Sequence, residues 1–216
     1  MKPQELFERA VTFNGNGWRA FPVKVIRSAK TQTLIKKPAI KGYHGARPFT
    51  AQELRYMPWR NATHVGVTFG PNHCLLDIDI KRGGHGFAHL DQLMAAYGPL
   101  PVTATQHTPS GGQHLLFATE IRLGRGIPRS AHLPDGQTSN IDLVRFRNMY
   151  AVVYDDTLLQ VDPQEVPVLP AAWHPLFRKR PRRVRGVQRR AAAARTPGTG
   201  RSSTAELLTA RLRNAR

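Results

Sequence analysis

The segment Leu75-Leu-Asp-Ile-Asp-Ile80 constrains the fold more than any other part of the sequence, because it holds two charges within an apolar run. Short apolar runs of this kind predict buried β-strands, in which alternate side chains lie on the same face. Asp77 and Asp79 are therefore expected on one face, and the neighbouring leucine and isoleucines in a core on the other. Two carboxylates so close repel each other unless a cation lies between them, so the segment predicts a site for Mg²⁺ or Mn²⁺. The alternative is an exposed strand end with solvated acids.

Further strand and helix patterns surround this segment. Strands are expected at 18–23, 63–69, 72–80, 102–108, 113–119, 139–146 and 149–155, and helices at 5–13, 50–60 and 85–98. Thr50 and Glu53 form a capping box, and Pro109-Ser-Gly-Gly112 forms a hairpin-like turn between two strands. Residues 36–38, Lys-Lys-Pro, are expected in a loop. The whole pattern is typical of an α+β fold, a mainly antiparallel sheet with helices packed against it.

Positive charge is concentrated near the C-terminus. The chain has 32 Lys and Arg against 14 Asp and Glu, and residues 174–216 hold 13 of these basic residues but a single acid, Glu206. Polyanions are the natural partners of such a segment, nucleic acid first and an anionic membrane surface second. We therefore expect a folded domain at 1–174 and a basic, flexible tail at 175–216, although a solvated tail without a partner has the same composition. The residues expected to contact nucleic acid are Arg178, Lys179, Arg180, Arg182, Arg183 and Arg185.

The remaining composition narrows the class of protein. Cys74 is the one cysteine of the sequence, which excludes an internal disulfide and a multi-cysteine zinc site. No stretch reaches the roughly 18 apolar residues that indicate a membrane span, and the N-terminal residues lack the continuous apolar core of a signal peptide. We expect a cytoplasmic protein with no membrane partner.

A third carboxylate, Asp142, lies within the apolar strand pattern Asn140-Ile-Asp-Leu-Val144. An unpaired charge in such a strand is costly. Beside Asp77 and Asp79 it would complete a site for two metal ions, which can activate an attacking hydroxyl and stabilise a leaving pyrophosphate. Otherwise it is a structural aspartate paired with an arginine, for which Arg145 and Arg147 are near in sequence.

The turn between the two acidic motifs has residues suited to phosphate. Gly111 and Gly112 allow the backbone to come close to a ligand, and their amides can bind phosphate oxygens. Ser110 offers a hydroxyl group, and His114 can donate a hydrogen bond to a phosphate. Taken singly, a Ser-Gly-Gly sequence is usually a turn and a histidine is usually structural.

The order of these motifs resembles a known family. Asp-Ile-Asp-Ile at 77–80, Thr-Pro-Ser-Gly-Gly-Gln-His at 108–114 and Ile-Asp-Leu-Val at 141–144 are similar to the catalytic series of the archaeo-eukaryotic primase superfamily. More narrowly, the chain resembles the bifunctional primase/polymerase domains of plasmids, phages and prophages over about residues 5–155. The family's glycine-rich turn after the last acid is replaced here by Arg-Phe-Arg-Asn at 145–148.

The resemblance implies a fold and a role for each matching residue. The fold would combine a small N-terminal α/β module with a module resembling an RNA-recognition-motif sheet, with a catalytic cleft between them. Asp77, Asp79 and Asp142 would ligate the metal ions, and Ser110 and His114 would contact the phosphates of the incoming nucleotide. Residues 1–174 would then be the primase-polymerase catalytic domain.

The resemblance also implies substrates and partners. The protein would copy a single-stranded DNA template with ribo- or deoxynucleoside triphosphates, and any helicase would be a separate partner. Two other functions stay open at this point. One is a metal-dependent nuclease or phosphohydrolase, because acids and a histidine serve that chemistry as well. The other is a non-catalytic nucleic-acid-binding replication protein on the same fold.

Overall fold

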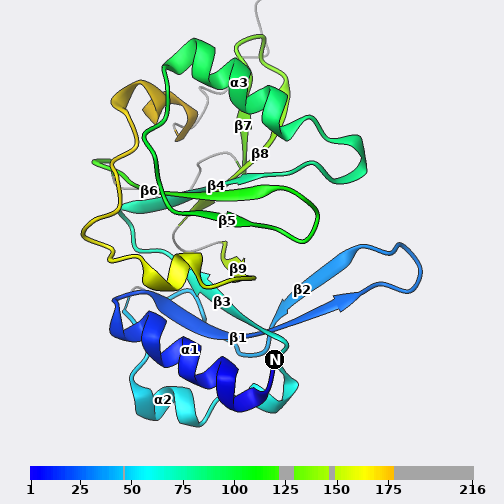
Figure 1. Ribbon diagram of the computed structural model, residues 1–216, viewed down its shortest axis with the longest axis vertical. Helices are drawn as coiled ribbons and strands as arrows, with labels where there is room; N and C mark the ends of the chain where they lie inside the picture. Colours follow the sequence, from blue (N-terminus) through cyan, green and yellow to red (C-terminus); the bar gives the residue numbers. More distant parts are fainter. Residues whose placement is uncertain (46, 122–128, 146–148, 178–216) are drawn as a thin grey trace, which may run out of the picture. The chain divides into compact units, whose positions relative to one another are not determined.

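Nine strands form two antiparallel sheets in the computed structural model, which describes residues 1–45, 47–121, 129–145 and 149–177 (Figure 1). All of these residues belong to one compact unit. The first sheet has the order β2-β1-β3-β9, with strands Leu34–Pro38, Arg19–Arg27, His64–Thr68 and Ala151–Val153. The second has the order β5-β6-β4-β8-β7, with strands Thr105–His107, Gln113–Ala118, His73–Ile78, Thr138–Arg145 and Ser130–His132.

Two helices cover one face of the first sheet (Figure 1). Helix α1 (Pro3–Gly15) begins with a proline, which is favoured at the first helical position, and it buries Leu6, Ala10 and Phe13. The short helix α2 (Ala51–Arg55) has the expected capping box: Thr50 accepts a hydrogen bond from the Glu53 amide and donates its own amide to the Glu53 carboxylate.

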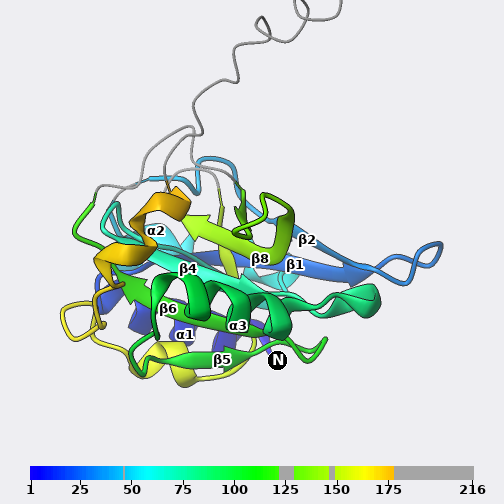
Figure 2. The same cartoon turned by 90° about the horizontal axis from the view of Figure 1, so that it is seen from above.

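A long hairpin of β1 and β2 extends the first sheet and runs out from it in both views (Figures 1 and 2). The expected loop at 36–38 was wrong, because Lys36, Lys37 and Pro38 pair with Val25, Lys24 and Val23 in this hairpin. Lysine and proline are uncommon in strands, and proline is tolerated here because β2 is an edge strand.

The second sheet buries one face against helix α3 (Gly86–Tyr97). Leu76 and Ile78 of β4 are fully buried there with Leu93 of the helix, as the alternation in the sequence predicts. Strand β4 ends at Ile78, so Asp79 follows the strand rather than lying within it.

The other face of the second sheet shares a core with the first sheet. Leu75, Leu116 and Val144 lie directly opposite one another on β4, β6 and β8, and they pack in one cluster with Trp18 and Phe69. The next side chains along these three strands on the same face are Asp77, His114 and Asp142. The apolar contact between the sheets therefore leads directly to the predicted acidic residues.

The predicted α+β class is confirmed, with helices packed on antiparallel sheets. The expected strands at 63–69, 72–80, 113–119 and 139–146 correspond to β3, β4, β6 and β8 within a few residues. The remaining irregular helical segments are Trp59–Asn61, Lys81–Gly83, Thr157–Gln160 and Ala171–Phe177. Among the described residues, no helix has both the length and the apolar composition needed to cross a membrane.

Candidate active site

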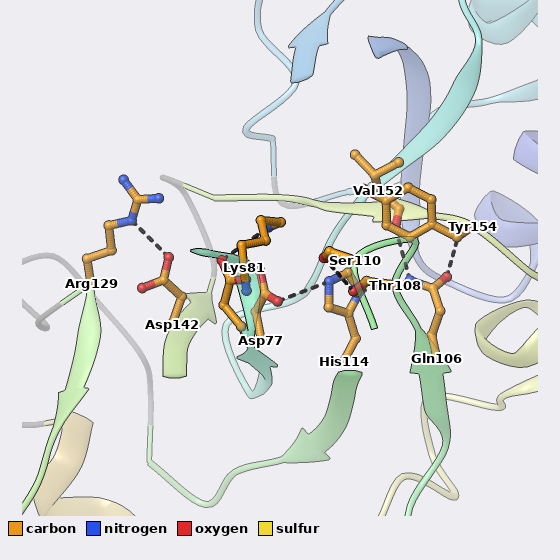
Figure 3. Close-up of polar contacts among 11 residues, drawn as sticks. Asp77, Lys81, Gln106, Thr108, Ser110, His114, Arg129, Asp142, Val152 and Tyr154 are labelled. Atoms are coloured by element: carbon orange, nitrogen blue, oxygen red, sulfur yellow. Dashed lines mark hydrogen bonds and ion pairs between the residues drawn. The ribbon is translucent and has the colours of Figure 1, made fainter. Parts of the chain in front are cut away.

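A row of polar side chains crosses the second sheet at one level. Gln106, His114, Asp77, Asp142 and Ser130 occupy directly opposite positions on the five neighbouring strands β5, β6, β4, β8 and β7. Directly opposite residues of antiparallel strands point to the same face. The row therefore places carboxylates, an imidazole, an amide and a hydroxyl on one face of the sheet, and Figure 3 shows the first four of its residues, Gln106, His114, Asp77 and Asp142.

The central feature of the row is the pairing of Asp77 with Asp142. Like charges directly opposite each other on neighbouring strands are destabilising, because their side chains lie about 5 Å apart. The arrangement places carboxylate oxygens, the donors that Mg²⁺ and Mn²⁺ prefer, on adjacent strands. The two acids that were far apart in the sequence are thus brought together by strand register.

His114 is almost completely buried, and its ring lies next to the Asp77 carboxylate. Its exposed fraction is 1%, and its Nε2 atom lies 3.4 Å from the Asp77 carboxylate. Burial raises the pKa of the Asp77 carboxyl, but the hydrogen bond from His114 and the positive charges of Lys36 and Lys81 act against it, and the pKa is below its ordinary value. Asp77 is consequently held in its charged form, which a cation requires.

Gln106 determines which nitrogen of His114 carries the proton. Its Oε1 accepts from the Tyr154 amide at 2.8 Å, and its Nε2 donates to the Val152 carbonyl at 3.0 Å. These two backbone partners fix the orientation of the amide, so Nε2 also faces His114 Nδ1, at 2.8 Å. Nδ1 must therefore accept, and the proton of the neutral ring lies on Nε2, which points to Asp77 (Figure 3).

Asp79 and Asp142 both have basic neighbours. Asp79 accepts hydrogen bonds from the Lys81 amide at 2.9 Å and from Lys81 Nζ at 3.1 Å. Asp142 accepts from Arg129 Nε at 3.0 Å and from the Ser130 hydroxyl. The alternative of an arginine-paired aspartate is thus present, but the arginine is Arg129. Because its side chain is 79% exposed, this ion pair is weak.

The Ser-Gly-Gly turn has a clear structural basis. Thr108 and Gly111 close the turn through a hydrogen bond from the Gly111 amide to the Thr108 carbonyl. Gly111 has φ of +84°, and a Cβ at Gly112 would lie 2.1 Å from the Ile78 carbonyl oxygen, so both positions favour glycine. The Ser110 hydroxyl bonds to that of Thr108 at 3.1 Å (Figure 3). Since the Gly111 amide is used within the turn, phosphate binding by these glycines stays a prediction.

The donor set fits a metal ion, although the three acids are not gathered into a finished site. Within the residues that the structure describes, no three His, Cys, Asp or Glu side chains are grouped closely enough to hold a metal. Asp77 and Asp142 face each other across β4 and β8, and Asp79 lies one residue beyond the end of β4. A metal ion would replace Lys81 and Arg129 as the charge partners of these acids.

Two residues of this region, Gln106 and Tyr154, were missed at the sequence level, and Lys36 was expected in a loop. Gln106 is fully buried in the row, Tyr154 has its ring centroid 6.2 Å from that of His114, and Lys36 lies 5.7 Å from the Tyr154 ring. Burial, with the charge of Asp77 adding to it and that of Lys81 opposing it, raises the pKa of Tyr154 to about 12, so its hydroxyl stays protonated. A lone glutamine and a lone tyrosine carry no recognisable signal in a sequence.

The basic residues predicted to contact nucleic acid lie outside the described residues. They are Arg178, Lys179, Arg180, Arg182, Arg183 and Arg185.

Comparison with known proteins bears on this arrangement. The family model of the bifunctional DNA primase/polymerase N-terminal domain matches residues 10–175, a range that contains the whole polar row and the Ser-Gly-Gly turn. A search of curated proteins found no match to the chain.

Proposed function

Because the chain belongs to the bifunctional DNA primase/polymerase family, we propose that it is a DNA-dependent primase/polymerase of plasmid, phage or prophage-type replication. Membership of the family implies a nucleotidyl-transfer enzyme of DNA replication, with DNA and nucleotides as substrates. In the proposed reaction a 3′-hydroxyl, or the hydroxyl of an initiating nucleotide, attacks the α-phosphorus of a nucleoside triphosphate. A new phosphodiester bond forms as the hydroxyl proton passes to water, and pyrophosphate leaves with the electrons of the broken bond between the α-phosphorus and the bridging oxygen.

The observation that carries this proposal is the register of β4, β6 and β8. It places Asp77 opposite both His114 and Asp142 on one face of the sheet. Asp77, Asp142 and Asp79 would hold Mg²⁺ or Mn²⁺, which neutralises developing negative charge and lowers the pKa of the attacking hydroxyl. The protein's own contribution is to hold these donors in place before the substrates bind.

The proposed nucleotide contacts come from the neighbouring turn and strand. Ser110 and the glycines at 111–112 would meet the triphosphate, and His114 would donate its Nε2 proton. The position of the proton on Nε2, fixed by Gln106, supports a donor role. His114 is nearly buried, so a phosphate would have to approach where Asp77 now accepts its hydrogen bond.

One observation favours the non-catalytic alternative. Lys81 pairs with Asp79, and Arg129 pairs with Asp142, so part of the carboxylate charge is already neutralised by the chain itself. A protein that only binds nucleic acid could keep such pairs permanently. In the enzyme, both pairs are exposed enough that a divalent cation can displace them at little cost.

A synthesis assay tests the proposal. The full chain is incubated with single-stranded template, labelled nucleoside triphosphates and Mg²⁺ or Mn²⁺, with and without a primer. We expect products with the wild type and none with the double substitution Asp77→Ala/Asp79→Ala. Asp91→Asn is the matched control, because this exposed aspartate lies on α3, on the far side of the second sheet.

The outcomes separate the three functions. Products that form without a primer would establish priming, and products only with a primer would establish extension alone. Degradation of DNA or triphosphate without synthesis would favour the nuclease or phosphohydrolase. A folded protein that binds the template but makes no product with either metal would favour the binding protein.

A further inference from the structure

The β1–β2 hairpin lies in a part of the chain that contains no acid. Between Glu8 and Glu53 there is no Asp or Glu, and residues 24–41 alone hold six Lys or Arg. The six are Lys24, Arg27, Lys30, Lys36, Lys37 and Lys41. All but Lys36 are exposed, and none of them takes part in an ion pair with another residue that the structure describes. This charge is therefore left for an external anion.

The strand register concentrates this charge further. Lys24 lies directly opposite Lys37, and both side chains are exposed. Two like charges in this position destabilise a hairpin. The adjacent pair on the same face is Ile26 opposite Ile35, each 37% exposed. A hairpin shaped only for its own stability would have an acid at one of the two lysine positions.

The base of the hairpin is next to the polar row. On the face opposite to Lys24, Lys36 lies 5.7 Å from the Tyr154 ring, whose centroid is 6.2 Å from that of His114. Lys36 is also close enough to lower the pKa of Asp77 through its charge, although burial and His114 act more strongly. From this point the hairpin runs outward, with Arg27 and Lys30 toward its tip (Figures 1 and 2).

We infer that the β1–β2 hairpin is an arm that binds the phosphate backbone of single-stranded DNA and leads the DNA strand to the polar row. The inference rests on the proposed function, since it takes DNA as the polyanion. Lysines on both faces of β2, a sheet edge, can contact successive phosphates of a strand that runs along this edge. An anionic membrane would satisfy the same charge, but it would not explain why the base of the hairpin lies next to the polar row.

The substitution Lys24→Glu tests whether the hairpin binds DNA, without lowering the stability of the hairpin. It removes the phosphate contact of Lys24, and it engages Lys37 in a cross-strand ion pair that withdraws the contact of Lys37 as well. The ion pair stabilises the hairpin. Arg55→Glu on α2 is the matched control, because it changes the net charge by the same amount on an exposed residue away from the hairpin (Figures 1 and 2). The full-length proteins are titrated into a fluorescent single-stranded oligonucleotide at a series of salt concentrations, without triphosphate.

We expect Lys24→Glu to weaken binding about tenfold and to reduce the slope of log affinity against log salt by about 1.4, which corresponds to two phosphate contacts. Arg55→Glu is expected to change binding less than about twofold, the small effect of remote charge under screening. The melting temperature of Lys24→Glu should equal or exceed that of the wild type. The reciprocal substitution Lys37→Glu should behave in the same way.

Equal effects of Lys24→Glu and Arg55→Glu would overturn the inference, because only net charge would then matter. Unchanged binding by Lys24→Glu would overturn it as well. So would hairpin-dependent binding to phosphatidylserine vesicles together with hairpin-independent binding to DNA. If the wild type synthesises DNA while Lys24→Glu binds the oligonucleotide normally, the inference of a DNA-binding arm is wrong and the polymerase proposal stands. If binding depends on the hairpin but no synthesis occurs, the polymerase proposal fails instead.

Discussion

The two sheets of this protein each place like charges directly opposite one another, but with opposite sign. In the second sheet Asp77 faces Asp142, and in the first sheet Lys24 faces Lys37. The acidic pair is half-buried beside a shared core, whereas the lysines are exposed on a projecting hairpin. Both pairs cost stability in the free protein.

Because the acidic pair and the lysine pair differ in burial, they are suited to different ligands. Half-buried carboxylates have few ways to be neutralised, so they favour a compact divalent cation at a defined position. Exposed lysines carry their charge on long, flexible side chains, so they favour an extended polyanion whose exact position is not fixed. The second sheet is suited to binding a metal ion at one position, and the first sheet is suited to contacting a DNA strand along its length.

The largest expected effect comes from breaking the acidic pair with Asp142→Asn. Synthesis should fall about a hundredfold or more, because a ligand of the metal ions is lost. Stability without divalent metal should stay within about 1 kcal/mol of the wild type, since relief of the repulsion with Asp77 offsets the exposed ion pair with Arg129. Primer extension and thermal unfolding measure the two quantities.

Metal titration completes this test. Mg²⁺ or Mn²⁺ should raise the melting temperature of the wild type, because a ligand that binds only the folded state stabilises it. The same addition should have little effect on Asp142→Asn. Synthesis by Asp142→Asn at a rate close to wild type would show that the acidic pair is not a metal site.

A smaller effect is expected at Gln106, where the two sheets meet. Gln106→Leu would leave Val152, Tyr154 and His114 each without a buried hydrogen-bond partner, which should cost about 3 kcal/mol in total. Synthesis should fall about tenfold at temperatures where the variant is folded, mainly through weaker binding of the triphosphate. Thermal unfolding and the dependence of rate on triphosphate concentration measure these effects.

The position of the His114 proton separates positioning from simple destabilisation. Nitrogen NMR of the imidazole should show the proton on Nε2 in the wild type, and a mixture or the Nδ1 form in Gln106→Leu. Gln113→Leu is the matched control on the neighbouring strand and should leave the ring unchanged. A wild-type ring protonated on Nδ1 would refute the assignment.

The smallest effect is expected in the helical layer of the first sheet. Thr50→Ala removes the cap of α2 and should cost about 1 kcal/mol, without changing synthesis or DNA binding. The hydrogen bonds from Arg47 and from the Thr50 amide lower the pKa of Glu53 to about 2. Stability from Glu53 is therefore present above the ordinary carboxyl pKa and is lost as the pH falls toward 2.

Thermal unfolding of Thr50→Ala at neutral and acidic pH checks both points. A large loss of synthesis in this variant would mean that the helical layer influences the polar row, contrary to the expectation that Thr50 affects stability alone.

The sequence predicted the parts of the molecule that follow local rules. The alternation around Asp77 gave β4 and its buried face, the Thr50–Glu53 spacing gave the capping box, and the glycines gave the β5–β6 turn. Each of these depends on neighbours within a few residues. That is why they could be recognised without knowledge of the fold.

The features that could not be predicted from the sequence depend on pairing between segments that are far apart in the chain. The sequence offered Asp142 as a third acid beside Asp77 and Asp79, but only the β4–β8 register brings it opposite Asp77. The loop predicted at residues 36–38 is part of β2, because these residues lack strand-like alternation and become a strand only by pairing with β1. Gln106 acts through the backbone of Val152 and Tyr154, which no local pattern connects to it.

The order of strands along the chain has a consequence for synthesis on the ribosome. The first sheet begins with β1, β2 and β3, but its last strand, β9, follows all five strands of the second sheet. Until residues 151–153 have emerged, the edge of β3 with Val65 and Val67 has no partner from β9. An open apolar edge of this kind is a hazard for aggregation. A nascent chain released before that point would carry Asp77 and Asp142 without the backbone groups that orient Gln106, and its open strand edge would favour association with other copies.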